Sequence, residues 1–114
     1  MSEILGIARF KFHEGKVEEY KRLSAQCMEI VRTKDTGTLQ YDIYLNDDES
    51  EAIVIERYRN SEALIEHLAH VDHLMEPILA TGSVSGETLG EPSTELRAKM
   101  ADSEVRLFTP FQSM

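Results

Sequence analysis

RYRNSEALIEHLAHVDH, residues 57–73, joins the end of a buried strand to the start of a helix, and the other predicted elements pack around this junction. Asn60 or Ser61 can cap that helix, and Glu62 lies in its first turn, where the helix dipole stabilises an acidic side chain. Apolar side chains then return at helical spacing along one stripe, which comprises Leu64, Leu68, Val71, Leu74, Met75 and Ile78. We expect Pro77 to bend or restart this helix near its end.

The chain before this stretch predicts a strand followed by a helix. Side chains in residues 4–12 alternate, with Ile4, Gly6, Ala8, Phe10 and Phe12 on one face and Leu5, Ile7, Arg9 and Lys11 on the other. Residues 13–16 open a helix that runs to about Lys34 and ends before Gly37. Its inward stripe comprises Val17, Tyr20, Ser24, Cys27, Met28 and Val31. Cys27, the only cysteine, is therefore interpreted as a small core residue rather than a nucleophile.

A hairpin follows the first helix. Residues 39–46 and 52–59 both alternate as strands do, and the short acidic turn NDDES joins them, which favours antiparallel pairing. On the second of these strands, Val54, Glu56 and Tyr58 share one face. A carboxylate in the middle of an apolar strand is costly unless it is paired or hydrogen-bonded.

The segments after residue 80 add a strand and an extension. Residues 82–90 predict a weaker strand with three glycines, and residues 92–100 predict a short helix. Residues 104–111 predict a last strand, at a sheet edge because of Pro110. The order βαββαβ predicts a single α+β domain over residues 1–114, of the ferredoxin-like type, with helices on one face of an antiparallel sheet.

Composition limits the classes of partner. The 114 residues carry a formal net charge of −9, which argues against nucleic acid and anionic membrane surfaces, because both bind concentrated lysine and arginine. The N-terminus lacks the basic region and apolar run of a signal peptide, and no apolar run approaches the length of a membrane span. We therefore expect a protein of the cytoplasm.

The sheet face away from the helices predicts a homodimer. That face would carry Leu5, Ile7, one side of the hairpin strands and Leu107, and an apolar patch of this kind is unusual on a monomer. Stacking two sheets would cover it, and residues 92–114 would then lie at the interface. The alternative is that this extension folds back over its own sheet.

The histidines suggest a metal site at first, but helical geometry argues against it. His67, His70 and His73 are spaced by three residues, and each step turns the side chain by 60°, so they do not converge. Only His67 falls on the apolar stripe; His70 lies at its flank and His73 on the far side. An inward imidazole is either a satisfied core residue or part of a pocket.

Glu56 and His67 are the candidate catalytic residues. The strand and helix that carry them are adjacent in sequence, so the two side chains can approach each other. One interpretation is a structural pair, Glu56 with His67 or with an arginine; the other is a general base with a pKa tuned by burial. Tyrosine hydroxyls could orient a polar aromatic ligand: Tyr20, Tyr41, Tyr44 and Tyr58. The sequence contains no phosphate-binding loop, nucleophile elbow or CxxC motif, which leaves chemistry without an obvious cofactor or metal.

Several segments resemble a known family. IARFKFHEGKVEEY (residues 7–20), GTLQYDIY (37–44) and ERYRNSEALIEHL (56–68) are similar to successive blocks of the antibiotic biosynthesis monooxygenase (ABM) family. GEPSTELR (90–97) resembles its quinol monooxygenase branch. The resemblance implies a dimeric α+β barrel with a pocket in each subunit between sheet and helices. It also implies oxidation of a small aromatic quinol or polyphenol by molecular oxygen without flavin, haem or metal.

The resemblance also assigns roles to residues. Glu56, Tyr58 and His67 match the pocket region, with Tyr41 on the facing strand. The candidate catalytic residues are Glu56 and His67, either of which would deprotonate the substrate, and the candidate substrate-binding residues are Tyr41, Tyr58 and His70. Tyr58 stands where many relatives have tryptophan. The haem-degrading branch resembles a site built on tryptophan, with an asparagine in the first strand. This chain has no tryptophan and its first asparagine is Asn46, which argues against haem degradation.

Three hypotheses follow. The first is a cofactor-independent monooxygenase acting on an aromatic diol or quinol. The second is a dimeric protein that binds a hydrophobic small molecule without chemistry. The third is a structural or stress-related dimer in which side chains fill the space between sheet and helices.

Overall fold

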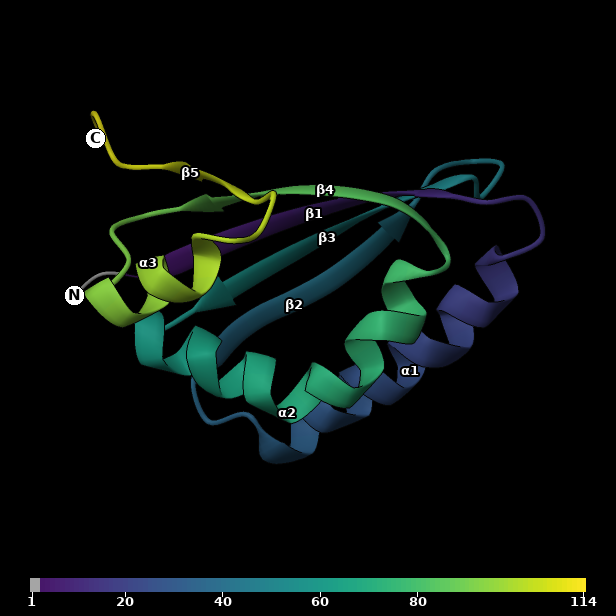
Figure 1. The fold of residues 1–114 in the computed structure, drawn as a ribbon, viewed down its shortest axis with the longest axis horizontal. Helices are drawn as coiled ribbons and strands as arrows, with labels where there is room; N and C mark the ends of the chain where they lie inside the picture. Colours follow the sequence, from purple (N-terminus) through teal and green to yellow (C-terminus); the bar gives the residue numbers. More distant parts are fainter. Residues whose placement is uncertain (1–2) are drawn as a thin grey trace.

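The computed structural model describes residues 3–114 as one five-stranded sheet with helices against one of its faces (Figure 1). The strand order is β2-β3-β1-β4-β5, so the first strand lies at the centre. The elements are β1 (Ile4–Phe12), α1 (Val17–Lys34), β2 (Thr38–Leu45), β3 (Glu51–Tyr58), α2 (Ser61–Leu79), β4 (Gly82–Leu89), α3 (Thr94–Met100) and β5 (Arg106–Phe108). This order confirms the predicted ferredoxin-like α+β class.

The sheet is mixed rather than wholly antiparallel. β1 pairs antiparallel with β3 and with β4, and β2 pairs antiparallel with β3. β5 pairs with β4 in parallel, because α3 and the loop after it carry the chain back before the last strand begins. β5 lies at the sheet edge, as Pro110 predicted, but it has only three residues.

α2 begins where the sequence predicted. The side chain of Asn60 accepts a hydrogen bond of 2.9 Å from the backbone N–H of Ala63, which satisfies one of the free donors of the first turn. The helix continues through Pro77 to Leu79 without restarting, and Figure 1 shows it turning toward the sheet in its last turns. Leu68, expected on the inward stripe, is 38% exposed, and His67 is buried on that face.

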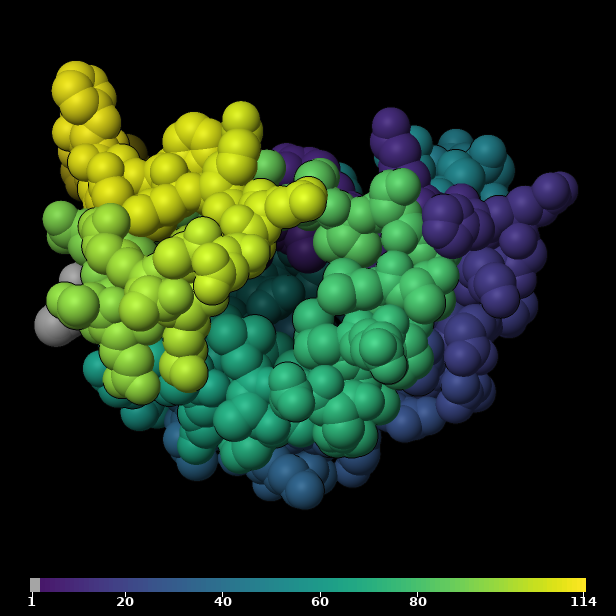
Figure 2. Space-filling view, in the orientation of Figure 1, coloured from purple at the N-terminus to yellow at the C-terminus, as the bar shows by residue number. Residues whose placement is uncertain are grey.

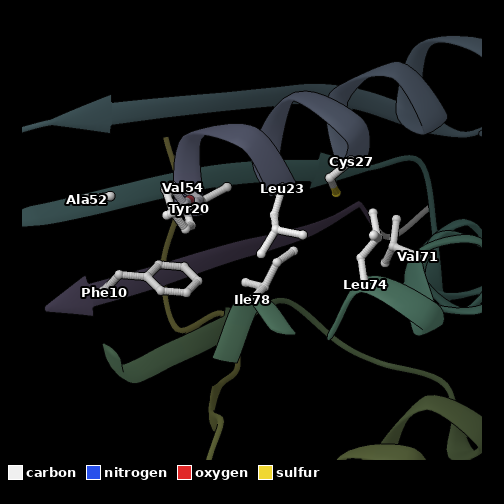
Figure 3. Close-up of a cluster of buried hydrophobic side chains, with 9 residues drawn as sticks. All are labelled: Phe10, Tyr20, Leu23, Cys27, Ala52, Val54, Val71, Leu74 and Ile78. Atoms are coloured by element: carbon white, nitrogen blue, oxygen red, sulfur yellow. The ribbon is translucent and has the colours of Figure 1, made fainter. Parts of the chain in front are cut away.

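The main core lies between the sheet and the two long helices (Figure 3). It contains Phe10, Tyr20, Leu23, Cys27, Ala52, Val54, Val71, Leu74 and Ile78. The predicted stripe of α1 omitted Leu23, which is among the most buried residues of that helix. Cys27 is buried in this core, and burial raises the pKa of its thiol, which agrees with a packing role.

The opposite face of the sheet carries no helix and exposes apolar side chains. Tyr44 is 57% and Ile53 40% exposed there, and the two are in register on neighbouring strands. Phe108 is also exposed beside Leu89. Leu107 was predicted for this outer face, but it is in register with Thr88, which lines the helix side of the sheet. The prediction is therefore wrong, because the neighbouring residue Phe108 is the one on the outer face.

None of the helices within residues 3–114 combines the length and the apolar character needed to cross a bilayer.

Candidate functional site

A pocket of about 650 Å³ lies between the sheet and helices α2 and α3. Gly6, Ala8 and Gly86 line its floor, and Gly6 and Ala8 leave room above the strands because they carry little or no side chain. Gly6 lies opposite Glu56, and a Cβ at Gly6 would meet the Glu56 side chain at 3.8 Å. Figure 2 shows the hollow between the yellow-green C-terminal segment and the green part of α2. This space argues against a fold whose interior is filled by side chains.

The C-terminal segment forms one wall of the pocket. Leu96 on α3 is fully buried and belongs to a second core cluster with Ile4 and Tyr58. The rest of the wall comes from Lys99, Met100, Ser103, Glu104 and Val105. Because β5 pairs with β4 of the same chain, this part of the extension folds back along its own sheet. Its place at a dimer interface stays a prediction.

Glu56 and Tyr58 form a short hydrogen bond at the pocket. They project from the same face of β3, two residues apart, and the Tyr58 hydroxyl donates to Glu56 Oε1 at 2.5 Å. Burial raises the pKa of Glu56, and the bond from Tyr58 only partly offsets this. Burial also raises the pKa of Tyr58, so its hydroxyl stays protonated and donates. Burial therefore favours an uncharged carboxyl group at Glu56, although the bond from Tyr58 acts in the opposite direction.

Asp35 holds the imidazole of His67. The Asp35 side chain, 1% exposed, follows the end of α1, and its Oδ2 lies 2.8 Å from His67 Nδ1. Oδ1 of the same carboxylate lies 2.7 Å from His70 Nδ1, and Thr38 donates to Oδ2 at 2.7 Å. Burial alone would raise the pKa of Asp35, but the hydrogen bonds from His70, Thr38 and His67 together hold that pKa below its ordinary value. Asp35 is thus an ionised, buried acceptor.

His67 presents its second nitrogen to the pocket. The imidazole lines the pocket with its ring centroid 5.4 Å from the centroids of both Tyr41 and Tyr58. Within residues 3–114 no hydrogen bond reaches Nε2, and no fully buried side-chain nitrogen or oxygen lacks a partner. Nε2 is therefore accessible from the pocket and can accept a proton there.

The structure brings together four of the five predicted site residues, since Glu56, His67, Tyr41 and Tyr58 all line the pocket. Glu56 and His67 do not bond to each other, because Tyr58 and Asp35 are their respective partners. His70 does not line the pocket and lies on the other side of Asp35.

Two of the remaining side chains considered from the sequence lie away from this site. Tyr44 lies on the outer face, and His73 is exposed on α2, as its helical position predicted.

Asp35 is the site residue that the sequence analysis missed. It follows α1 directly, in the run KDTG, which reads as an ordinary turn. One signal was available: an acidic side chain at the C-terminal end of a helix opposes the helix dipole, so it needs a compensating donor or cation. The two histidines that compensate it are more than thirty residues away, and no local pattern identifies them.

Asp35, Glu66 and His70 also place possible metal-ligating atoms within 4.8 Å of one another. Both Asp35 oxygens already accept hydrogen bonds, and Glu66 accepts from the backbone N–H and the hydroxyl of Thr36. These bonds account for the arrangement of the cluster.

Solved structures share the fold at low sequence identity. MupZ from Pseudomonas fluorescens is 23% identical with a TM-score of 0.86, over 98% of this chain and 88% of that one. Rv0793 from Mycobacterium tuberculosis is 24% identical with a TM-score of 0.70, over 80% and 96%. SnoaB from Streptomyces nogalater, described as a cofactor-independent oxygenase and solved as the N63A mutant, is 15% identical with a TM-score of 0.68, over 81% and 95%. The likeness extends through the C-terminal segment for MupZ.

Sequence comparison identifies the family. No curated protein matches this chain significantly. The family model described as antibiotic biosynthesis monooxygenase matches residues 4–74, which is more than half of the chain and includes Asp35, Glu56 and His67. The chain belongs to the antibiotic biosynthesis monooxygenase family.

Proposed function

We propose that this chain is a cofactor-independent monooxygenase that oxidises a small aromatic quinol or polyphenol with molecular oxygen. The observation that carries the proposal is the imidazole of His67, held through Nδ1 by a buried carboxylate and open to the pocket through Nε2. Family membership supports the same chemistry, as does the fold shared with SnoaB, a protein described as a cofactor-independent oxygenase.

His67 is the base in this proposal. Nε2 takes the proton of a substrate hydroxyl, and the charge of Asp35 stabilises the imidazolium that forms. The substrate anion is electron-rich and passes an electron to oxygen, after which one oxygen atom joins the ring. For hydroquinone, the balance is one quinol and one O₂ giving one hydroxyquinone and one water, so that the substrate supplies every electron that O₂ takes up.

Glu56 and the tyrosines have different roles. Because burial favours the protonated form of Glu56, this carboxyl group can give a proton to the oxygen atom that leaves as water. The rings of Tyr41 and Tyr58 flank His67. Tyr41 is partly buried and offers a face against which an aromatic substrate can pack, whereas Tyr58 is 0% exposed and acts through its hydrogen bond to Glu56.

The proposed assembly is a homodimer in the cytoplasm, formed by stacking the outer faces of two sheets. Exposed Tyr44, Ile53 and Phe108 on that face support it, because stacking the two sheets would remove these apolar side chains from water. In this arrangement the helix side of each sheet keeps its own pocket.

Oxygen uptake with a panel of hydroquinones and polyphenols tests the proposal, in a buffer that contains a chelator and no flavin. Wild type and His73→Gln should consume oxygen, because His73 is exposed away from the pocket, whereas His67→Gln should lose at least about 100-fold in rate. Binding of a ligand that is unchanged in Glu56→Gln and His67→Gln, with no oxygen consumed, would instead support the second candidate, a dimeric small-molecule-binding protein without catalysis.

A further inference from the structure

The carboxylate of Asp35 is shared between two imidazoles that lie in different surroundings. The side chain of His67 is 4% exposed and faces the pocket, while that of His70 is 27% exposed and faces the surface. Each occupies a separate oxygen of Asp35, His67 on Oδ2 and His70 on Oδ1. One bond to Asp35 is enough to satisfy Nδ1 of buried His67, so the bond between Asp35 and His70 needs a separate explanation.

An ionised carboxylate only accepts hydrogen bonds, so both imidazoles must donate to it. In the neutral form, each ring therefore carries its proton on Nδ1 and leaves a lone pair on Nε2. For His67 this is the form in which the pocket-facing nitrogen can accept a proton. The opposite form, with the proton on Nε2, would present a donor to the pocket and could not act as a base.

His70 also limits the orientation of the carboxylate. Thr38 and His67 bond to Oδ2 and His70 bonds to Oδ1, so a rotation of the carboxylate would break bonds on both oxygens. The bond from His70 persists whether His70 is neutral or protonated, because Nδ1 carries a proton in both states. Glu66, with a possible ligating atom within 4.8 Å of one on His70, adds a further negative charge on the surface side.

We propose that Asp35 and His70 act together as positioning residues: Asp35 fixes the Nδ1–H form of His67, and His70 locks the Asp35 carboxylate in place. Neither residue touches the substrate. The expected effect of these two residues on turnover rests on the proposed function, but their expected effect on the tautomer of His67 does not.

Nitrogen NMR of the ¹⁵N-labelled imidazoles tests this without a substrate. In wild type at a pH where both rings are neutral, His67 and His70 should carry the proton on Nδ1. Asp35→Asn should shift His67 toward the Nε2–H form, because an amide NH₂ can face Nδ1 and favour its lone pair. His70→Ala should give a mixture of forms at His67, while His70→Gln, whose amide can still donate to Asp35, should remain close to wild type. His73→Gln, on the same helix but exposed, is the matched control.

Turnover gives a separate measurement wherever oxygen uptake is seen. Asp35→Asn should lower kcat about 10- to 100-fold with KM little changed, and His70→Ala by a smaller factor that His70→Gln restores. A wild-type His67 that carries its proton on Nε2, or a His67 form that stays the same in Asp35→Asn and His70→Ala, would overturn the proposal. The predicted NMR changes without turnover on any quinol would support the positioning and contradict only the proposed function. His70→Ala, which alters a partly exposed residue, keeps the test usable if Asp35→Asn fails to fold.

Discussion

Asp35→Asn should destabilise the fold by an amount that depends on pH. The substitution keeps the shape of the side chain and removes the charge that accepts bonds from His67, His70 and Thr38. Hydrogen bonds to charged groups contribute about 1.5–3 kcal/mol each, and some will be kept in weaker form. Thr38 and His70 can recover part of the loss through water, whereas buried His67 keeps only a hydrogen bond to the neutral amide, which is weaker than its bond to the carboxylate. We expect a loss of about 2–4 kcal/mol at neutral pH, which corresponds to a fall in Tm of roughly 10 °C for a domain of this size.

The pH dependence follows from the direction of the Asp35 pKa. That pKa is lowered in the folded state, so the stabilisation is complete above the ordinary value of 3.8 and is lost as pH falls through the lowered folded value. The difference between wild type and Asp35→Asn should therefore be full at pH 7 and should narrow in acid, where wild-type Asp35 also becomes neutral.

Urea unfolding at pH 7 and at the lowest pH where both proteins fold gives the two free energies of unfolding. Asp72→Asn, an exposed aspartate on α2, is the control and should remain within about 0.5 kcal/mol of wild type. An Asp35→Asn protein as stable as the control, or a difference that stays constant into acid, would refute this description of the buried carboxylate.

Three further predictions concern the pocket and the outer face. Glu56→Gln should raise the free energy of unfolding relative to wild type at neutral pH. The pKa of Glu56 is raised in the folded state, so the stability of wild type falls as pH rises above the ordinary value of 4.5. Urea titrations at pH 4 and pH 8 should show the stabilisation by Glu56→Gln only at pH 8. Ile53→Arg places a charge on the exposed outer face, so the variant should be a monomer with an intact pocket. Light scattering at micromolar concentration should show this monomer and a dimeric wild type. A wild-type monomer would contradict the proposed assembly. Leu96→Ala, at a fully buried position of the pocket wall, should cost about 2–5 kcal/mol in thermal or urea unfolding, and a loss below 1 kcal/mol would show that α3 packs loosely.

Local patterns were enough to predict the fold. The alternation from Ile4 to Phe12, the cap at Asn60 and the apolar stripe of α2 each depend on neighbouring residues, and the structure agrees with all three in the main. The errors were small shifts at the periphery. Leu107 was assigned to the wrong face of a strand of three residues, which is too short to show a reliable alternation.

The candidate site was predicted less completely, because its key contact is not local. Glu56 and His67 were identified because a polar side chain on an apolar face requires a partner. The partners themselves were not identified, since Asp35 lies 32 residues before His67 and looks like a turn residue in the sequence. His70, named as a candidate substrate-binding residue, lies 2.7 Å from Asp35 Oδ1 through its Nδ1, and no local pattern in the sequence identifies this partner.

Mass spectrometry of the product formed under ¹⁸O₂ shows whether molecular oxygen supplies the atom that is added to the substrate. In metal-free and flavin-free buffer, the proposal predicts that a quinol substrate gives a hydroxyquinone that has gained one ¹⁸O atom, formed by wild type and by His73→Gln but not by His67→Gln. A product without ¹⁸O, or one formed as fast by His67→Gln as by wild type, would contradict a cofactor-independent oxygenation that begins with the pocket imidazole.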